Sequence, residues 1–248
     1  MCVLEGPDLV FAALDSGVEF EALYVDRLAT AHEGATEVID RARAAGVRLF
    51  ALEPGVLEKI ADTKTPQPVL ASVRFRVPDV ASLAVRGLTL VLHDVRDPGN
   101  AGTIIRSADA AGVTSVVLTG QSVDPFNPKT LRASAGAIFH LPVAVGSLGV
   151  VLDHFVRGSA RTWATVVREG EDLTRVDFSG SSVVVIGNEA DGLDQAAIDL
   201  CQGSLRIAMT GRSESLNAGV AASLVAFAAL WQREGTGSSL APPSLTGL

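Results

Sequence analysis

Short apolar runs alternate with stretches of helical periodicity along most of the chain. From residue 88 onward, apolar runs typical of buried strands occur at residues 89–93, 115–119, 137–145, 162–166, 182–186 and 205–208. Between and after them, the spacing of apolar residues predicts helices at residues 100–111, 128–134, 148–156, 195–201 and 217–233. Strands that alternate with helices build a mainly parallel sheet flanked by helices. We therefore predict an α/β fold for residues 88–233.

A smaller α/β unit is predicted at the N-terminus, over residues 1–76. Its pattern indicates helices at residues 7–14, 35–45 and 56–62 and strands at residues 22–25 and 47–51, with a loop at residues 63–68. Residues 77–87 are expected to link the two units. Residues 234–248 are rich in Gly, Ser, Pro and Thr, and we expect them to form a flexible tail.

The most informative segment covers residues 90–113, LVLHDVRDPGNAGTIIRSADAAGV, in which a buried strand leads into a helix. Pro98 and Gly99 favour a turn there, and Asn100 is a residue type suited to capping the helix. Arg106 lies near the start of the same helix, where a cation interacts unfavourably with the helix dipole. This position suggests that Arg106 is present for a functional reason.

Two later segments also combine a strand with a polar loop, VVVIGNEADGL at residues 183–193 and LRIAMTGRSESLNAGVAASLVAFAAL at residues 205–230. Gly187 and Gly192 permit tight backbone turns in the first of them. In this order and spacing, and with residues 123–143 between them, the three segments resemble the motifs of the SpoU/TrmH family of RNA ribose 2′-O-methyltransferases, which belongs to the SPOUT class. The resemblance covers residues 88–233 and implies a knotted sheet, which periodicity alone does not predict. EGPDLV at residues 5–10 resembles the substrate-binding domain that precedes many family members.

The resemblance implies S-adenosylmethionine as the methyl donor. The chain has no G-x-G-x-x-G loop after a strand and no P-loop, so a conventional dinucleotide site is not expected. Matching the family motifs residue by residue places donor contacts at Gly187, Ile207 and Leu216. The loop after the second predicted strand offers further candidates at Leu118, Thr119 and Gly120.

Five polar residues match the polar motif positions of the family: Asn100, Arg106, Glu189, Ser215 and Asn217. Because an arginine is charged throughout the ordinary pH range, we expect Arg106 to hold a phosphate and stabilise the developing alkoxide, not to act as the base. Asn100 and Glu189 would position Arg106 or the ribose, and Ser215 and Asn217 would shape the third loop and bind the hydroxyl or the donor. One departure is SLNAGVA at residues 215–221, where the family commonly has SLNVSVA, so Gly219 replaces a hydroxyl.

Charge and composition limit the partners. The net charge of −8 gives no overall basic footprint, so an RNA-binding surface must be a local patch. The sequence lacks an apolar stretch of membrane-spanning length, and Cys2 and Cys201 suggest no disulfide framework, so we expect a cytoplasmic protein that binds neither membrane nor DNA. The four histidines have no metal-ligand spacing, and we predict no metal.

The expected activity is methyl transfer to a ribose hydroxyl of RNA, with ribosomal RNA preferred over tRNA because of the N-terminal domain. Family members are usually homodimers, so a homodimer is expected here. Two alternatives stay open from the sequence: methyl transfer to tRNA, at its ribose or at a base, and a knotted RNA-binding protein without catalysis. The acidic charge and the altered third motif favour the second alternative, and retention of the polar motif residues opposes it.

Overall fold

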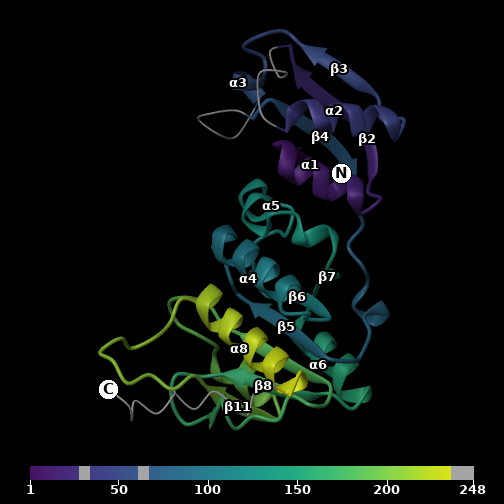
Figure 1. Ribbon diagram of the computed structural model, residues 1–248. Coiled ribbons are helices and arrows are strands. Elements are labelled where there is room, and N and C mark those ends of the chain that lie inside the picture. The colour runs from purple at the N-terminus through teal and green to yellow at the C-terminus, as the bar shows by residue number, and fades with distance from the viewer. Residues whose placement is uncertain (28–33, 61–66, 236–248) are drawn as a thin grey trace, which may run out of the picture.

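The computed structural model describes residues 1–27, 34–60 and 67–235 (Figure 1). Most of the predicted tail, from residue 236 on, and most of the predicted loop at residues 63–68 lie outside these ranges, as do the last two residues of the helix predicted at 56–62. Two separate sheets form, a small one near the N-terminus and a larger one in the remainder of the chain. This confirms the predicted α/β class with a small N-terminal unit.

The N-terminal unit contains a four-stranded sheet in the order β1-β4-β2-β3, in which only β2 and β3 are parallel. Its elements are β1 (Cys2–Glu5), α1 (Pro7–Asp15), β2 (Glu19–Asp26), α2 (Ala35–Ala44), β3 (Leu49–Leu52), α3 (Leu57–Ile60) and β4 (Val69–Arg74). Strands β1 and β4 were not predicted. They pair with each other from opposite ends of the unit, with Cys2 opposite Val73, so no local signal marks them as partners.

The larger sheet has seven strands in the order β7-β6-β5-β10-β8-β11-β9, and every pair in it is parallel. The strands are β5 (Leu88–His93), β6 (Ser115–Thr119), β7 (Val143–Gly146), β8 (Arg161–Thr165), β9 (Glu171–Asp172), β10 (Ser182–Ile186) and β11 (Gly203–Arg206). All carboxyl ends therefore lie along one edge. Strand β10 lies beside β5 although it comes much later in the chain, and this brings the second polar loop next to the first.

Helices cover both faces of the larger sheet. They are α4 (Pro98–Ala110), α5 (Pro128–Ser134), α6 (Leu148–Arg157), α7 (Gln195–Asp199) and α8 (Ala218–Arg233), with short 3-10 turns η2 (Val80–Ser82) and η3 (Ala137–Phe139). Alternate strand residues face the two sides: Leu90 packs in the cluster that contains α4 and α8, whereas Val91 packs in the cluster that contains α6. Because both faces are buried, the central strands β5, β6 and β10 consist mainly of Val, Leu and Ile.

The strand predicted at residues 137–145 is wrong in its first half. The structure has η3 at Ala137–Phe139 and a strand only from Val143. Gly136 adopts a φ of +89°, which turns the chain before η3, and Pro142 lacks the N–H that a paired strand residue donates. The apolar run is therefore buried without being extended.

The N-terminal unit packs against α5 and η3, at one end of the larger sheet (Figure 1). The ring of Phe75 meets those of Phe126 and Phe139 edge to face, each at a centroid distance of 5.5 Å. Arg132 on α5 forms an ion pair with the nearly buried Glu5 at 3.4 Å. These contacts connect the N-terminal unit to the helix that follows β6.

Candidate functional site

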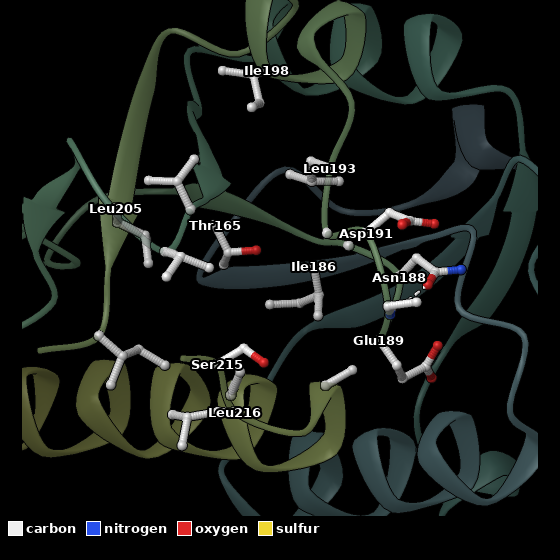
Figure 2. Close-up of a pocket in the computed structure, with 18 of the residues that line it drawn as sticks. Thr165, Ile186, Asn188, Glu189, Asp191, Leu193, Ile198, Leu205, Ser215 and Leu216 are labelled. Carbon is white, nitrogen blue, oxygen red and sulfur yellow. Dashed lines mark hydrogen bonds between the residues drawn. The ribbon is translucent and has the colours of Figure 1, made fainter. Parts of the chain in front are cut away.

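A cavity of about 300 Å³ lies at the carboxyl ends of β10, β8 and β11 (Figure 2). Its walls are mainly apolar, and the loop after β10 adds the acidic residues Glu189 and Asp191 to its rim. The carboxyl edge of a parallel sheet is where open α/β folds usually bind ligands. The apolar lining includes Val166, Ile186, Leu193, Leu205, Ile207, Met209 and Leu216.

The loop after β10 is shaped by two glycines. Asn188 and Gly192 exchange backbone hydrogen bonds of 3.1 and 3.0 Å, and Gly192 adopts a φ of +71°. A Cβ on Gly187 would lie 2.4 Å from the carbonyl carbon of Gly192, so only glycine fits under the returning loop. The loop is thus folded back on itself at the wall of the cavity, which both glycines line.

The structure brings some of the predicted donor-binding residues together and separates others. Gly187, Ile207 and Leu216 all line the cavity, as do the predicted Glu189 and Ser215. The other three predicted donor-binding residues, Leu118, Thr119 and Gly120, do not line the cavity.

Strand order explains the separation. Strand β6 lies on the far side of β5 from β10, so its end is two strands away from the cavity. There Thr119 Oγ1 lies 2.8 Å from His93 Nδ1. A Cβ on Gly120, which has a φ of +65°, would lie 2.2 Å from Asp94 Oδ1. The end of β6 thus packs against the end of β5.

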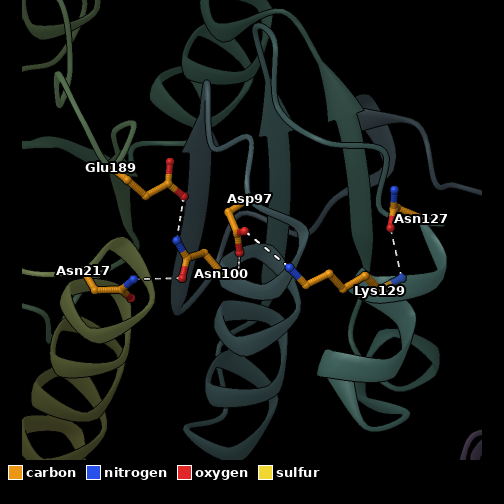
Figure 3. Close-up of polar contacts among 6 residues, drawn as sticks. All are labelled: Asp97, Asn100, Asn127, Lys129, Glu189 and Asn217. Atoms are coloured by element: carbon orange, nitrogen blue, oxygen red, sulfur yellow. Dashed lines mark hydrogen bonds and ion pairs between the residues drawn. The ribbon is translucent and has the colours of Figure 1, made fainter. Parts of the chain in front are cut away.

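Three predicted catalytic residues from three different segments form one hydrogen-bonded chain (Figure 3). Asn100 Nδ2 donates to Glu189 Oε1 at 2.7 Å, and Asn217 Nδ2 donates to Asn100 Oδ1 at 3.0 Å. Asn217 Oδ1 in turn accepts from the backbone N–H groups of Gly219 and Val220 and caps α8. The orientation of each amide is therefore determined by its neighbours.

Asn100 does not cap α4, contrary to the prediction. The helix begins at Pro98, and the cap is Asp97, whose Oδ1 accepts from the backbone N–H of Asn100 at 2.8 Å. This hydrogen bond, more than the nearby ammonium group of Lys129, lowers the pKa of Asp97. Because Asp97 satisfies the helix end, the amide of Asn100 is available for Glu189 and Asn217.

Arg106 is exposed on α4, and among the described residues none forms a hydrogen bond or ion pair with it. It lies beside the crossing of α4 and α8, where Ser223 Oγ donates to Ser107 Oγ at 2.8 Å. A guanidinium group without a protein partner is available to an external anion.

An open groove of about 480 Å³ runs between α4 and α8 and shares Asn100 and Asn217 with the polar chain. Val220 and Leu224 lie in it with 48% and 39% of their surfaces exposed, which is high for large apolar residues. Gly219 also lines the groove, and a Cβ there would lie 3.0 Å from Asn217 Oδ1 and 3.4 Å from Thr103 Cγ2. The glycine that departs from the family motif therefore lets α8 begin close to α4.

Sequence reasoning missed Thr165, Asn188, Leu193 and Leu205, all of which line the cavity. Thr165 ends β8 and donates its hydroxyl to the carbonyl of Val185 at 2.9 Å. Its position at the carboxyl end of a predicted parallel strand was a usable signal. Asn188 lies between two predicted residues, and nothing in the residue pattern distinguished it.

Two absences apply to the described part of the chain. Residues 1–27, 34–60 and 67–235 contain no group of three or more His, Cys, Asp or Glu side chains arranged to hold a metal ion. Within the same ranges, each helix is too short or too polar to cross a membrane.

Comparison with known proteins identifies both parts of the chain. Residues 87–227 match the SpoU rRNA Methylase family, and residues 3–76 match the RNA 2′-O ribose methyltransferase substrate binding family. The 23S rRNA (guanosine(2553)-2′-O)-methyltransferase RlmP of Bacillus subtilis is 32% identical over 91% of this chain and 86% of its own length. The 23S rRNA (uridine(2479)-2′-O)-methyltransferase of Streptomyces viridochromogenes is 35% identical over 74% of this chain and 67% of its own length.

Solved structures agree with these matches. The SpoU methyltransferase AviRb of Streptomyces viridochromogenes in complex with AdoMet has a TM-score of 0.84 at 29% identity, covering 94% of this chain and 90% of that chain. The AdoMet-bound rRNA methyltransferase of Sinorhizobium meliloti has a TM-score of 0.80 at 29% identity, with 93% and 87% coverage. The resemblance stated from the motifs is confirmed, and the chain belongs to the SpoU rRNA methylase family.

Proposed function

We propose that this protein transfers a methyl group from S-adenosylmethionine to a ribose 2′-hydroxyl of ribosomal RNA. The observation that carries the proposal is the hydrogen-bonded chain of Glu189, Asn100 and Asn217, which joins three separate motifs at the rim of the cavity. The relatives named above are 23S rRNA 2′-O-methyltransferases, which supports ribosomal RNA as the substrate.

The cavity fits the donor. Its volume of about 300 Å³ is at the lower end of the range of roughly 300–1,000 Å³ for small-molecule sites. Ile207 and Leu216 offer apolar surface for an adenine ring, and Gly187 leaves main-chain groups accessible to its edge. Glu189 and Asp191 on the rim favour a positively charged group. S-adenosylmethionine supplies an electrophilic methyl group when it is bound.

The polar residues would act on the ribose and its phosphate. Arg106 is exposed and is proposed to bind the phosphate next to the target ribose and to stabilise the negative charge that develops on the 2′-oxygen. Glu189 and Asn217 hold Asn100 from opposite sides, so its amide is fixed before RNA binds. The hydroxyl oxygen gains the methyl group and releases its proton to the phosphate or to water, because Arg106 keeps its own proton.

Ser215 is proposed to position the loop that precedes α8. It lines the cavity next to Leu216, and two residues later Asn217 caps the helix. The loop thus has one end at the donor cavity and the other at the polar chain. A change in donor binding would be transmitted over two residues to Asn217.

We also propose a homodimer in which a second copy covers the groove between α4 and α8. Val220 and Leu224 are exposed there, and burying such surface is favourable. The groove contains Asn100 and Asn217, so the second copy would lie at the site itself. Val220→Glu is expected to yield monomers by light scattering. Val150→Glu, at a 60% exposed valine on α6 outside the groove, is expected to leave the mass unchanged.

Three further proposals follow from family membership and the two sheets. The chain is proposed to be knotted within residues 88–233 and to act in the cytoplasm, where ribosomal RNA is found. The domain boundaries are proposed at residues 1–76 and 88–233, with a linker at 77–87. The two family matches, at residues 3–76 and 87–227, support this division.

The deciding experiment measures tritium transfer from labelled S-adenosylmethionine to total RNA of a strain that lacks this gene, followed by nucleoside analysis. We expect a 2′-O-methylnucleoside in ribosomal RNA. Arg106→Ala should abolish the label without weakening donor binding. Arg157→Ala, the control at an exposed arginine on α6, should leave the label unchanged. Label in tRNA would show that tRNA, and not ribosomal RNA, is the substrate. Donor binding without label in any RNA would favour the non-catalytic alternative.

A further inference from the structure

The loop that lines the cavity is tied to the end of a neighbouring strand through one side chain. Asn188 Nδ2 donates to the carbonyl oxygen of Asp94 at 3.0 Å, and Asn188 Oδ1 accepts from the backbone N–H of Ala190 at 2.7 Å. The same residue also exchanges the two backbone hydrogen bonds with Gly192. Asn188 is therefore bonded both within its own loop and to the end of β5.

Asp94, which receives this bond, has an unusual backbone conformation. Its φ is +58°, in the left-handed region that non-glycine residues seldom occupy, although Asp tolerates it better than most. Its carboxylate accepts from the backbone N–H of Gln121 at 2.5 Å, and its own N–H donates to the carbonyl of Thr119 at 3.2 Å. These bonds hold Asp94 in place from the β6 side. Its carbonyl is thus a fixed acceptor for Asn188.

The residue next to Asn188 in sequence is Glu189, which accepts the hydrogen bond from Asn100. Figure 2 shows the two side chains leaving the same loop in different directions. Asn188 joins the loop to the start of the segment between β5 and α4, and Glu189 joins it to the first turn of α4. The segment is thus bonded to the loop near both of its ends.

We propose that Asn188 is a positioning residue for methyl transfer. Its amide fixes the loop of residues 187–193, so that the donor cavity is formed in advance and Glu189 is in place to hold Asn100. The proposal rests on the proposed function and adds to it a residue that acts through Glu189 and through the cavity wall. Preorganisation of this kind matters because a displacement of about 1 Å can cost roughly 100-fold in rate.

The test replaces Asn188 by Asp, which keeps the acceptor for Ala190 but turns the donor into a charged oxygen facing the Asp94 carbonyl. We expect kcat to fall about 10- to 100-fold and the dissociation constant of S-adenosylmethionine to rise at least fivefold. The KM for RNA should change less than twofold. Gln195→Glu is the matched control, because it makes the same amide-to-acid change at an exposed residue of α7. Among the described residues, the side chain of Gln195 forms a hydrogen bond only with Asp199.

Three further measurements separate positioning from a loss of structure. Asn188→Ala removes the donor without adding charge and should show the same pattern, with an unchanged circular dichroism spectrum. Hydrogen exchange of the peptide containing residues 187–193 should accelerate in both variants. In a Glu189→Gln background, Asn188→Asp should lower kcat much less than it does in the wild-type protein, because the two changes act on the same step.

The outcomes distinguish this proposal from the one on which it rests. If the wild-type protein binds the donor but methylates no RNA, the proposed function fails, and donor affinity and exchange still decide the role of Asn188. Donor affinity and exchange rates equal to those of the Gln195→Glu control would overturn the positioning role. A fully additive effect in the Glu189→Gln background would also overturn it, since a general structural contribution would be additive.

Discussion

Replacing Asn100 by Asp tests the polar chain with almost no change of shape. The substitution removes the donor of the 2.7 Å bond to Glu189 and places a second carboxylate there. Two unit charges at that distance repel by roughly 1.5 kcal/mol in water and by about 6 kcal/mol at an effective dielectric of about 20. Both side chains are half-buried and can partly rotate apart. We therefore expect a loss near the lower value, about 2 kcal/mol, or about 4–8 °C in Tm.

The pH dependence of this loss identifies its cause. The neighbouring carboxylate raises the pKa of the introduced carboxyl in the folded protein above its unfolded value. Protonation then favours the folded state, so the deficit in Tm should be largest at neutral pH and shrink as pH falls through the raised pKa. Thermal unfolding of the wild type and the variant at several pH values between about 4.5 and 8 measures it.

A matched control is Asn127→Asp, because the Oδ1 of Asn127 only accepts, from the backbone N–H of Lys129 at 2.9 Å. That change should alter Tm little and with little dependence on pH in the same interval. A deficit in the Asn100 variant that stayed constant with pH would refute the reasoning, as would an equal deficit in the control. Methyl transfer by the Asn100 variant should be at least 100-fold slower at neutral pH.

Three other changes have definite expected results. Gly102→Ala should destabilise the protein by about 1–3 kcal/mol in urea unfolding, because its Cβ would lie 2.5 Å from the Thr130 carbonyl oxygen on α5. Asp97→Ala should cost about 0.5–2 kcal/mol through loss of the α4 cap. Since the hydrogen bond from the N–H of Asn100 lowers the pKa of Asp97, the difference in Tm from wild type should vanish as pH falls through that pKa. Gly187→Ala should weaken donor binding in calorimetry at least tenfold, whereas Gly149→Ala, whose Cβ meets nothing within 4 Å, should not.

The sequence predicted most elements of the larger sheet because each buried strand is a short apolar run between turn residues. It predicted Glu189, Asn100 and Asn217 as one site because all three match polar motif positions of the SpoU/TrmH family. The order of the strands was not predictable from periodicity, and this is why Thr119 and Gly120 were expected at the cavity. They lie at the end of β6, beyond β5, where they pack against His93 and Asp94.

Other differences arose from competition between similar residues. Asp97 and Asn100 lie within four positions of each other, and both are residue types that cap the start of a helix. The sequence does not say which of them caps α4. The structure selects Asp97, which leaves Asn100 for Glu189. Asn188 was missed because its partner is the backbone carbonyl of Asp94, and any residue type offers a carbonyl. The catalytic and donor-binding roles of the individual residues stay predictions until the variants are measured.

The position of β10 in the sheet has a consequence for how the chain folds during synthesis. Strand β5 pairs with β6 on one edge and with β10 on the other, where Leu88 lies opposite Ser182. The first edge can pair soon after it leaves the ribosome, whereas the second stays open until all residues up to Ile186 have been made. An open apolar edge is prone to aggregate, and pairing between distant segments is slow. The nascent chain is therefore most vulnerable between the emergence of β6 and that of β10, which makes this interval the one in which chaperones would protect it.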